Sequence, residues 1–138
     1  MAANPFVVDV HVQYLPQQSL PQQGLYRFAY TITITNTGDC TAQVLARRWL
    51  VRNDRGVPIQ EVRGLGVAGR QPVLEPGEAH TYTSGCELPT PQGQMEGHFV
   101  GITEEAQVFE CPIAAFTLDV DALPQQFASS SRGGQTLH

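Results

Sequence analysis

The sequence predicts an all-β protein folded as one β-sandwich of about seven strands. Residues 6–14 and 26–35 alternate apolar and polar side chains with the period of two that a half-buried strand requires. No window has a sustained period of 3.6, so no amphipathic helix is expected. Gly, Pro and Asn separate the apolar segments at short intervals, as turns between strands do. A length of 138 residues suits one domain with its own core.

Three strands are predicted in the first part of the chain. Residues 6–14 form the first, and the loop of residues 15–24, with two prolines and a glycine, follows it. Residues 26–35 have the clearest strand pattern and end at the turn Asn36–Asp39. Residues 42–53 carry apolar side chains on both parities, so this strand is expected inside a sheet.

The second part begins with a glycine-rich connection, residues 63–72. Pro76 and Gly77 fit the centre of a type II turn, and residues 80–84 follow as a strand. After a proline-rich loop, residues 97–103 and 107–120 are the last strands. The apolar parity reverses around residues 112–115, which predicts a bulge or a bend where the chain changes sheets.

Trp49 resembles the core tryptophan of immunoglobulin-like sandwiches. Cys40 and Cys86 flank it, but Cys40 directly follows a Gly-Asp turn and so lies at a strand entrance. We therefore expect no disulfide and a fibronectin-III-like sandwich. Residues 1–125 are assigned to the domain, and the polar residues 126–138 to a disordered tail.

Composition narrows the class of protein. A net charge of -5 and a pI near 5.2 argue against nucleic-acid binding, which needs clustered basic residues, and all 8 basic residues are arginine. No apolar run is long enough for a bilayer, and the N-terminal residues lack a basic leader, so no membrane partner and a cytoplasmic location are expected. The 3 cysteines contain no C-x-x-C pair, which indicates free thiols rather than a zinc site.

The glycines Gly64, Gly66 and Gly69 have the G-x-G-x-x-G spacing that holds a pyrophosphate in dinucleotide-binding proteins. Such a site needs a helix that opens within the motif, and two prolines shortly downstream exclude one. Two interpretations stay open. The glycines permit positive φ in an irregular connection, or they form an anion- or partner-binding loop with Arg63 and Arg70 at its ends.

No metal site is predicted, because the four histidines are scattered along the chain. His11 shares a strand face with Asp9, which fits a weak divalent-cation surface as well as a solvated face. The pairs Glu104–Glu105 and Asp119/Asp121 fit solubilising carboxylates. We assign no cofactor beyond a weak divalent cation.

Two further groups of residues could take part in catalysis or in anion binding. Ser84 and Cys86 share a strand parity with His80, an arrangement common in β-proteins, so we assign no catalytic residue. Arg47 and Arg48 precede the tryptophan; they could grip an anion, but a solubilising pair at a strand edge is the favoured interpretation.

Residues 64–97 contain the sequences G-x-G-V-x-G-x-Q-P-V-L-x-P-G-E and Y-T-S-G-C-x-L-x-T-P-x-G-x-M-x-G. Together with Arg48-Trp49 and residues 28–36 upstream, these sequences resemble the ApaG (CorD) family. Family members often have His where this chain has Arg48, and an Asp-Gly turn where it has residues 104–106. Any metal role of that histidine is therefore not expected here.

The resemblance implies a bacterial cytoplasmic protein with a fibronectin-III-like sandwich, often dimeric. It implies an association with cobalt resistance and magnesium efflux, and gene neighbours for diadenosine-tetraphosphate hydrolysis and ribosomal RNA methylation. Related domains in eukaryotic F-box proteins and in a polymerase-δ-interacting protein bind proteins. The family has no established catalytic activity.

We therefore expect a non-catalytic binding or regulatory module that presents residues 63–72 to a protein or a small phosphate-containing anion. Two alternatives remain. One is nucleotide or pyrophosphate binding or hydrolysis, with Arg63 and Arg70 on the phosphates and Glu61 or Glu75 on a metal. The other is direct binding of Co²⁺ or Mg²⁺. A homodimer is compatible with the edge strands of a sandwich.

Overall fold

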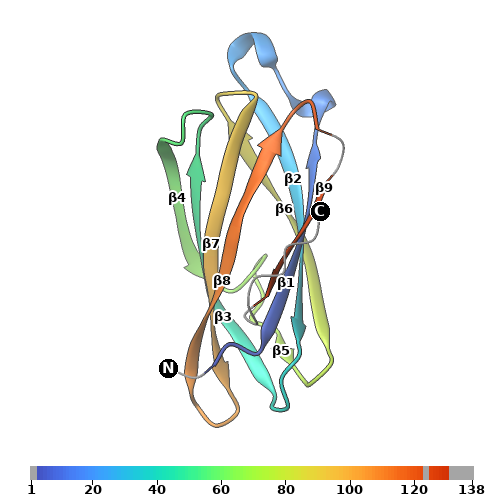
Figure 1. Cartoon of the computed structure of the whole chain (residues 1–138), viewed down its shortest axis with the longest axis vertical. Helices are drawn as coiled ribbons and strands as arrows, with labels where there is room; N and C mark the ends of the chain where they lie inside the picture. The colour runs from blue at the N-terminus through green and yellow to red at the C-terminus, as the bar shows by residue number, and fades with distance from the viewer. Residues whose placement is uncertain (1–2, 123–124, 131–138) are drawn as a thin grey trace.

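The computed structural model describes residues 3–122 and 125–130, and this part of the chain folds as the predicted all-β sandwich (Figure 1). Two short 3-10 turns, η1 (Pro16–Gln18) and η2 (Pro21–Gln23), follow the first strand. The strands are β1 (Phe6–Tyr14), β2 (Tyr26–Asn36), β3 (Ala42–Arg52), β4 (Pro58–Leu65), β5 (Val73–Leu74), β6 (Ala79–Leu88), β7 (Gln92–Thr103), β8 (Val108–Asp119) and β9 (Gln125–Ser130).

The strands form two antiparallel sheets. One has the order β6-β2-β1-β9, and the other has the order β4-β3-β7-β8 with β5 beside β3. Strand β8 contacts β1 and β9 across the sandwich, so that side is closed. Strands β4 and β6 are the edges on the opposite side.

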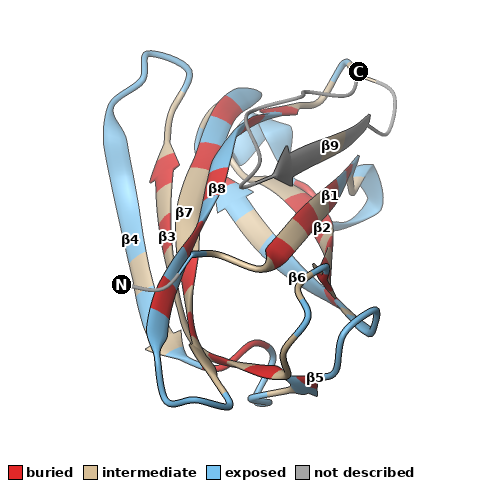
Figure 2. Ribbon diagram, turned by 60° about the horizontal axis from the view of Figure 1, so that its bottom comes forward, coloured by how far each residue is buried: buried red, intermediate tan, exposed pale blue. Residues whose placement is uncertain are grey.

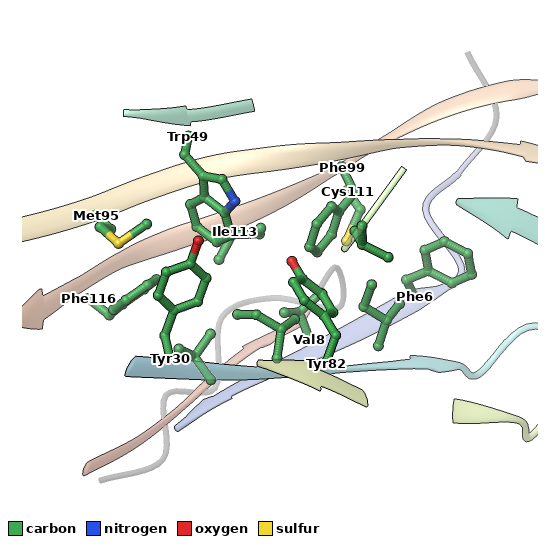
Figure 3. Close-up of a cluster of buried hydrophobic side chains, with 14 of the residues drawn as sticks. Phe6, Val8, Tyr30, Trp49, Tyr82, Met95, Phe99, Cys111, Ile113 and Phe116 are labelled. Atoms are coloured by element: carbon green, nitrogen blue, oxygen red, sulfur yellow. The ribbon is translucent and has the colours of Figure 1, made fainter. Parts of the chain in front are cut away.

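The core lies between the facing surfaces of the two sheets, where buried residues line the inner sides of β1, β2, β3, β6, β7 and β8 (Figure 2). Trp49 is 2% exposed and joins aromatic rings from both sheets. Its ring centroid is 5.5 Å from Tyr30 of the first sheet, and 6.2 Å and 6.0 Å from Phe99 and Phe116 of its own sheet (Figure 3). These edge-on contacts fit the preferred geometry of aromatic pairs.

Strand β3 contains a bulge that was not predicted. Its apolar residues on both parities were interpreted as burial of both faces of the strand. Val44 pairs with Gly101 but Ala46 pairs with Val100, so Leu45 is the extra residue. A single extra residue exchanges the inner and outer faces of a strand. Inward positions are therefore even-numbered before Leu45 and odd-numbered after it, which explains the apolar residues on both parities. The predicted central position is confirmed, because β3 lies between β4 and β7.

The predicted bulge in the last long strand is confirmed. Gly97 pairs with Ile113, whereas Met95 pairs with Phe116, so β8 has one residue more than β7 at this point. The suggested change of sheet is wrong, since β8 remains paired with β7 on both sides of the bulge.

Two elements differ from the prediction. Strand β4 begins at Pro58 and includes Arg63 and Gly64, so the glycine-rich connection starts inside a strand. β4 is exposed at most positions, and its ladder with β3 rather than alternating burial defines it. The predicted tail boundary is wrong, because residues 125–130 form β9, which pairs with β1. The rest of the predicted tail, residues 131–138, lies outside the described residues.

Asn36 connects the end of β2 to two neighbouring segments. Its side chain is fully buried, and Nδ2 donates to the carbonyls of Cys40 at 2.9 Å and Leu74 at 2.8 Å. Its Oδ1 accepts from the N–H of Gly38 at 2.9 Å. One amide thus satisfies backbone groups of the β2–β3 turn and of β5, which buried backbone requires.

Replacing Asn36 by Ala is expected to destabilise the protein by about 2–3 kcal/mol, because the carbonyls of Cys40 and Leu74 lose their buried donor. Urea unfolding followed by circular dichroism measures this change in the free energy of unfolding. The control is Thr33→Ala, which removes only an exposed hydrogen bond to Thr81 and is expected to cost less than about 1 kcal/mol. Equal losses in the two variants would contradict the role given to Asn36.

Candidate functional site

The glycine motif is a tight turn that follows strand β4. Val67 donates to the Arg70 carbonyl at 2.7 Å, and Arg70 donates back to the Val67 carbonyl at 3.0 Å. Ala68 and Gly69, between them, have φ of 48° and 79°, as in the two-residue turns of β-hairpins. Gly66 also has positive φ, 67°, and a Cβ there would collide with the Arg70 carbonyl. Gly66 and Gly69 thus meet the backbone requirements of a turn.

Three of the backbone N–H groups of this turn, those of Gly66, Val67 and Arg70, already have carbonyl partners. In addition to the two bonds within the turn, the Gly66 N–H donates at 2.6 Å to the carbonyl of Leu45, the bulged residue of β3. Val67 is fully buried and anchors the turn in the core. An anion nest needs N–H groups that are free to point at the ligand. The N–H groups of Gly66, Val67 and Arg70 are not free in this way.

The two arginines proposed to flank the loop lie in different settings. The Arg63 side chain is 70% exposed, and its Nε is 3.1 Å from Glu61 Oε1. Glu61 also accepts from Arg48 at 2.6 Å. These hydrogen bonds, first that of Arg63 and then that of Arg48, lower the pKa of the Glu61 carboxyl. Arg70 is an exposed residue of the turn itself. The anion-binding role of residues 63–70 stays a prediction.

Arg47 was expected to be a solubilising residue at a strand edge, and that expectation is wrong. The bulge at Leu45 turns the odd-numbered positions after it inward, so Arg47 lies on the same face as Trp49, on a strand with neighbours on both sides. Its Nη1 donates to the carbonyls of Leu65 and Gly66, each at 3.0 Å. A guanidinium held by two carbonyls at the end of β4 is fixed in position.

Gly64 provides the space for this guanidinium. It pairs with Arg47 across the β3–β4 ladder, and a Cβ at residue 64 would lie 2.8 Å from Arg47 Nη1 and 3.0 Å from its Cζ. Of the three motif glycines, Gly64 therefore serves the arginine, whereas the other two serve the turn.

A cleft of about 470 Å³ opens between the sheets on the side of β4 and β6. We call it the inter-sheet cleft. Phe28, Val51, Val62, Met95 and the ring of Trp49 supply apolar walls, and the polar groups come from Arg27, Tyr30, Arg47, Gln60, Ser84 and Glu87. Burial raises the pKa of the Tyr30 phenol, against the smaller opposing effects of a Ser84 hydrogen bond and the Arg47 charge.

A second, shallower depression of about 370 Å³ lies on the outer face of the β4-β3-β7 sheet. We call it the outer groove. Its lining residues are Ala46, Arg47, Arg48, Arg63, Gly64, Leu65, His98 and Val100, so Arg47 borders both this groove and the inter-sheet cleft. It is continuous with the exposed edge of β4.

The remaining candidates do not converge. Asp9 and His11 lie opposite Thr33 and Thr31 of β2, and His80 stacks on Tyr82 with ring centroids 6.2 Å apart. In the part of the chain that the structure describes, no three His, Cys, Asp or Glu side chains form a group that could hold a metal ion. All three cysteines are free.

Sequence reasoning missed the inter-sheet cleft. Its inward arginine could have been found only by placing the bulge in β3, since the alternation before Leu45 assigns Arg47 to the outside. Within the described ranges no helix is long and apolar enough to cross a bilayer.

The chain matches known proteins over most of its length. The family model of the ApaG domain matches residues 16–103. A relative named Protein ApaG from Acidovorax sp. (strain JS42) is 53% identical over 112 residues, which are 81% of this chain and 81% of the relative. Protein ApaG from Bordetella pertussis is 53% identical over 111 residues, 80% of this chain and 84% of the relative.

A solved structure agrees with the fold. The crystal structure of an ApaA protein from Bordetella pertussis is 48% identical in sequence and superposes with a TM-score of 0.82, covering 88% of this chain and 100% of that one. The family-model match of residues 16–103 spans the glycine turn and strand β3. The chain belongs to the ApaG family.

Proposed function

We propose that this chain is a non-catalytic binding and regulatory module that acts in divalent-cation homeostasis through a protein partner. The observation that carries this proposal is the exposed apolar edge of β4. Leu65 is 78% exposed, Val57 is 50% exposed and Ile59 is 40% exposed. Ile59 and Leu65 belong to β4, the last strand of its sheet, Val57 lies in the turn directly before it, and Leu65 lines the outer groove.

An edge strand with apolar side chains suits recognition by strand addition. Its outer N–H and C=O groups can pair with an extended segment of another protein, and its side chains supply contacts that select the segment. Arg48, Arg63 and Glu61 form an ion-pair cluster between the apolar positions. We infer that the partner contributes an extended segment with apolar residues to this edge.

The raised pKa values of the cysteine thiols support a function without covalent catalysis by cysteine. Burial raises the pKa of Cys86 to about 11 and that of Cys111 to about 11. The pKa of Cys40 is also raised. A nucleophilic cysteine needs the opposite, a thiolate stabilised at neutral pH.

Nucleotide or pyrophosphate hydrolysis has less support. The N–H groups of Gly66, Val67 and Arg70 are bonded to carbonyls, and Arg63 is paired with Glu61. Glu61, proposed as a metal ligand in that alternative, is engaged by two arginines.

The proposed binding of a protein partner at the exposed edge of β4 can be tested by photo-crosslinking in bacterial cells that express the protein. p-Benzoylphenylalanine in place of Leu65 or Ile59 is expected to give a discrete adduct with another protein. The same group in place of Thr83, which is exposed on the other sheet, is expected to give none. Equal labelling at the three positions would contradict the proposal. An adduct of twice 15.1 kDa alone would assign the edge to a second copy of the chain and overturn the heterologous partner.

Calorimetric titration with ATP, diadenosine tetraphosphate, pyrophosphate, Mg²⁺ and Co²⁺ is expected to give no saturable heat, and no phosphate is expected to be released. The reason is that the N–H groups of Gly66, Val67 and Arg70 are bonded to carbonyls and that no cluster of candidate metal ligands occurs among the described residues. Turnover of any of the three phosphoanhydrides would establish the hydrolase alternative. Saturable heat with Co²⁺ or Mg²⁺ alone would establish direct cation binding.

Alkylation of Cys86 by iodoacetamide is expected to be about tenfold slower than that of a free cysteine at neutral pH, because a pKa of about 11 leaves little thiolate. Between pH 7 and pH 9 the rate should rise about tenfold per pH unit without a plateau. Burial favours the protonated thiol in the folded state, so this contribution to stability is complete below about pH 9 and is lost as pH rises toward 11. Peptide mass spectrometry measures the rates, with the denatured protein as control. A plateau below pH 8 would indicate an activated thiol.

A further inference from the structure

The inter-sheet cleft contains a cation without an acidic partner. Arg47 donates to two carbonyls, and among the described residues no carboxylate lies within ion-pairing distance of it. The other cleft arginine differs, since Arg27 pairs with Glu87 at 2.8 Å. A guanidinium held in place by backbone is prepared to accept a planar anion with little loss of side-chain entropy.

The cleft also contains a buried donor without a partner. Trp49 is 2% exposed, lines the cleft, and its Nε1–H has no hydrogen bond. An indole N–H can only donate, and leaving it unpaired in the interior is unfavourable. Figure 3 shows Trp49 extending toward the opposite sheet, from which the hydroxyls of Tyr30 and Tyr82 point back. Arg27 Nε, at the same cleft, is likewise buried and unpaired.

The walls of the inter-sheet cleft indicate the size and polarity of the ligand. Phe28, Val51, Val62 and Met95 are apolar, and a volume of about 470 Å³ lies within the range of small-molecule sites. Arg47 and Trp49 can only donate, so the ligand must present an acceptor at their end. One guanidinium matches one carboxylate in charge and in bidentate geometry.

We propose that the inter-sheet cleft binds a small organic carboxylate with an apolar body, whose carboxylate accepts from Arg47 and from the indole N–H of Trp49. The apolar body lies between the two sheets against Phe28, Val62 and Met95. The cleft lies between the two sheets, whereas the partner surface proposed above is the exposed edge of β4; Arg47 borders both. Gly64 belongs to it by leaving room for the guanidinium.

Trp49 is the only tryptophan in the chain, so it reports on its own cleft. The full-length protein is titrated with octanoate, while tryptophan fluorescence and the single indole N–H resonance in ¹⁵N-correlated NMR spectra are recorded. We expect a saturable fluorescence change, and a downfield shift of the indole proton as it acquires a charged acceptor. Benzoate tests an aromatic body, 1-octanol tests the apolar body alone, and inorganic phosphate tests a bare anion.

Arg47→Met is expected to weaken octanoate binding at least tenfold. Arg52→Met, on the outer face of the same strand and paired with Glu96, is the matched control and is expected to change binding less than twofold. Gly64→Ala keeps the arginine but displaces its guanidinium, and should weaken binding severalfold. It keeps the proposal testable if Arg47→Met does not fold.

Several results would overturn the proposal. Equal responses to octanoate and 1-octanol would show an apolar cavity only, and equal responses to octanoate and phosphate would show a general anion site. Equal weakening by Arg47→Met and Arg52→Met would remove the assigned role of Arg47. An indole resonance that stays in place at saturation would remove Trp49 as a donor. No response to octanoate or benzoate would reject the site, whatever the crosslinking at β4 shows.

Discussion

The packing of Trp49 between the two sheets is the contact on which the rest of the structure depends. Its ring meets Tyr30 across the interface and Phe99 and Phe116 beside it, so one side chain joins β2, β3, β7 and β8. A large ring buried at the centre of a sandwich holds the sheets together and sets their separation locally. The inter-sheet cleft begins where this ring ends, on the side where β4 and β6 are edges.

The bulge at Leu45 connects the core to both candidate surfaces. It turns Trp49 and Arg47 inward together, and it frees the Leu45 carbonyl to accept the Gly66 N–H. The glycine turn is thereby attached to β3, and the end of β4 supplies the carbonyls that hold Arg47. The turn serves as a structural support, because its N–H groups hold the backbone that positions the arginine.

The two faces of β4 suit different partners. The outer face has exposed apolar residues and an ion-pair cluster centred on Glu61, which suits a protein segment. The inner face lines a cleft with donors and apolar walls, which suits a small carboxylate. Because both faces belong to one edge strand, a ligand in the cleft contacts the strand that a partner would extend. A regulatory module needs two sites joined by a common element of this kind.

The sequence by itself determined the sandwich, the strands with clear alternation and the bulge in β8, because the period of two reports directly which face of a strand is buried. It also determined the family, through the residues around the glycine motif. Strand β4 could not be predicted, since an exposed edge strand is defined by its ladder with β3. Strand β9 depends likewise on pairing with β1. The direction of Arg47 was decided only by the tertiary structure, because one extra residue at Leu45 reverses the strand's faces, and the resulting apolar residues on both parities also fit a strand buried on both sides.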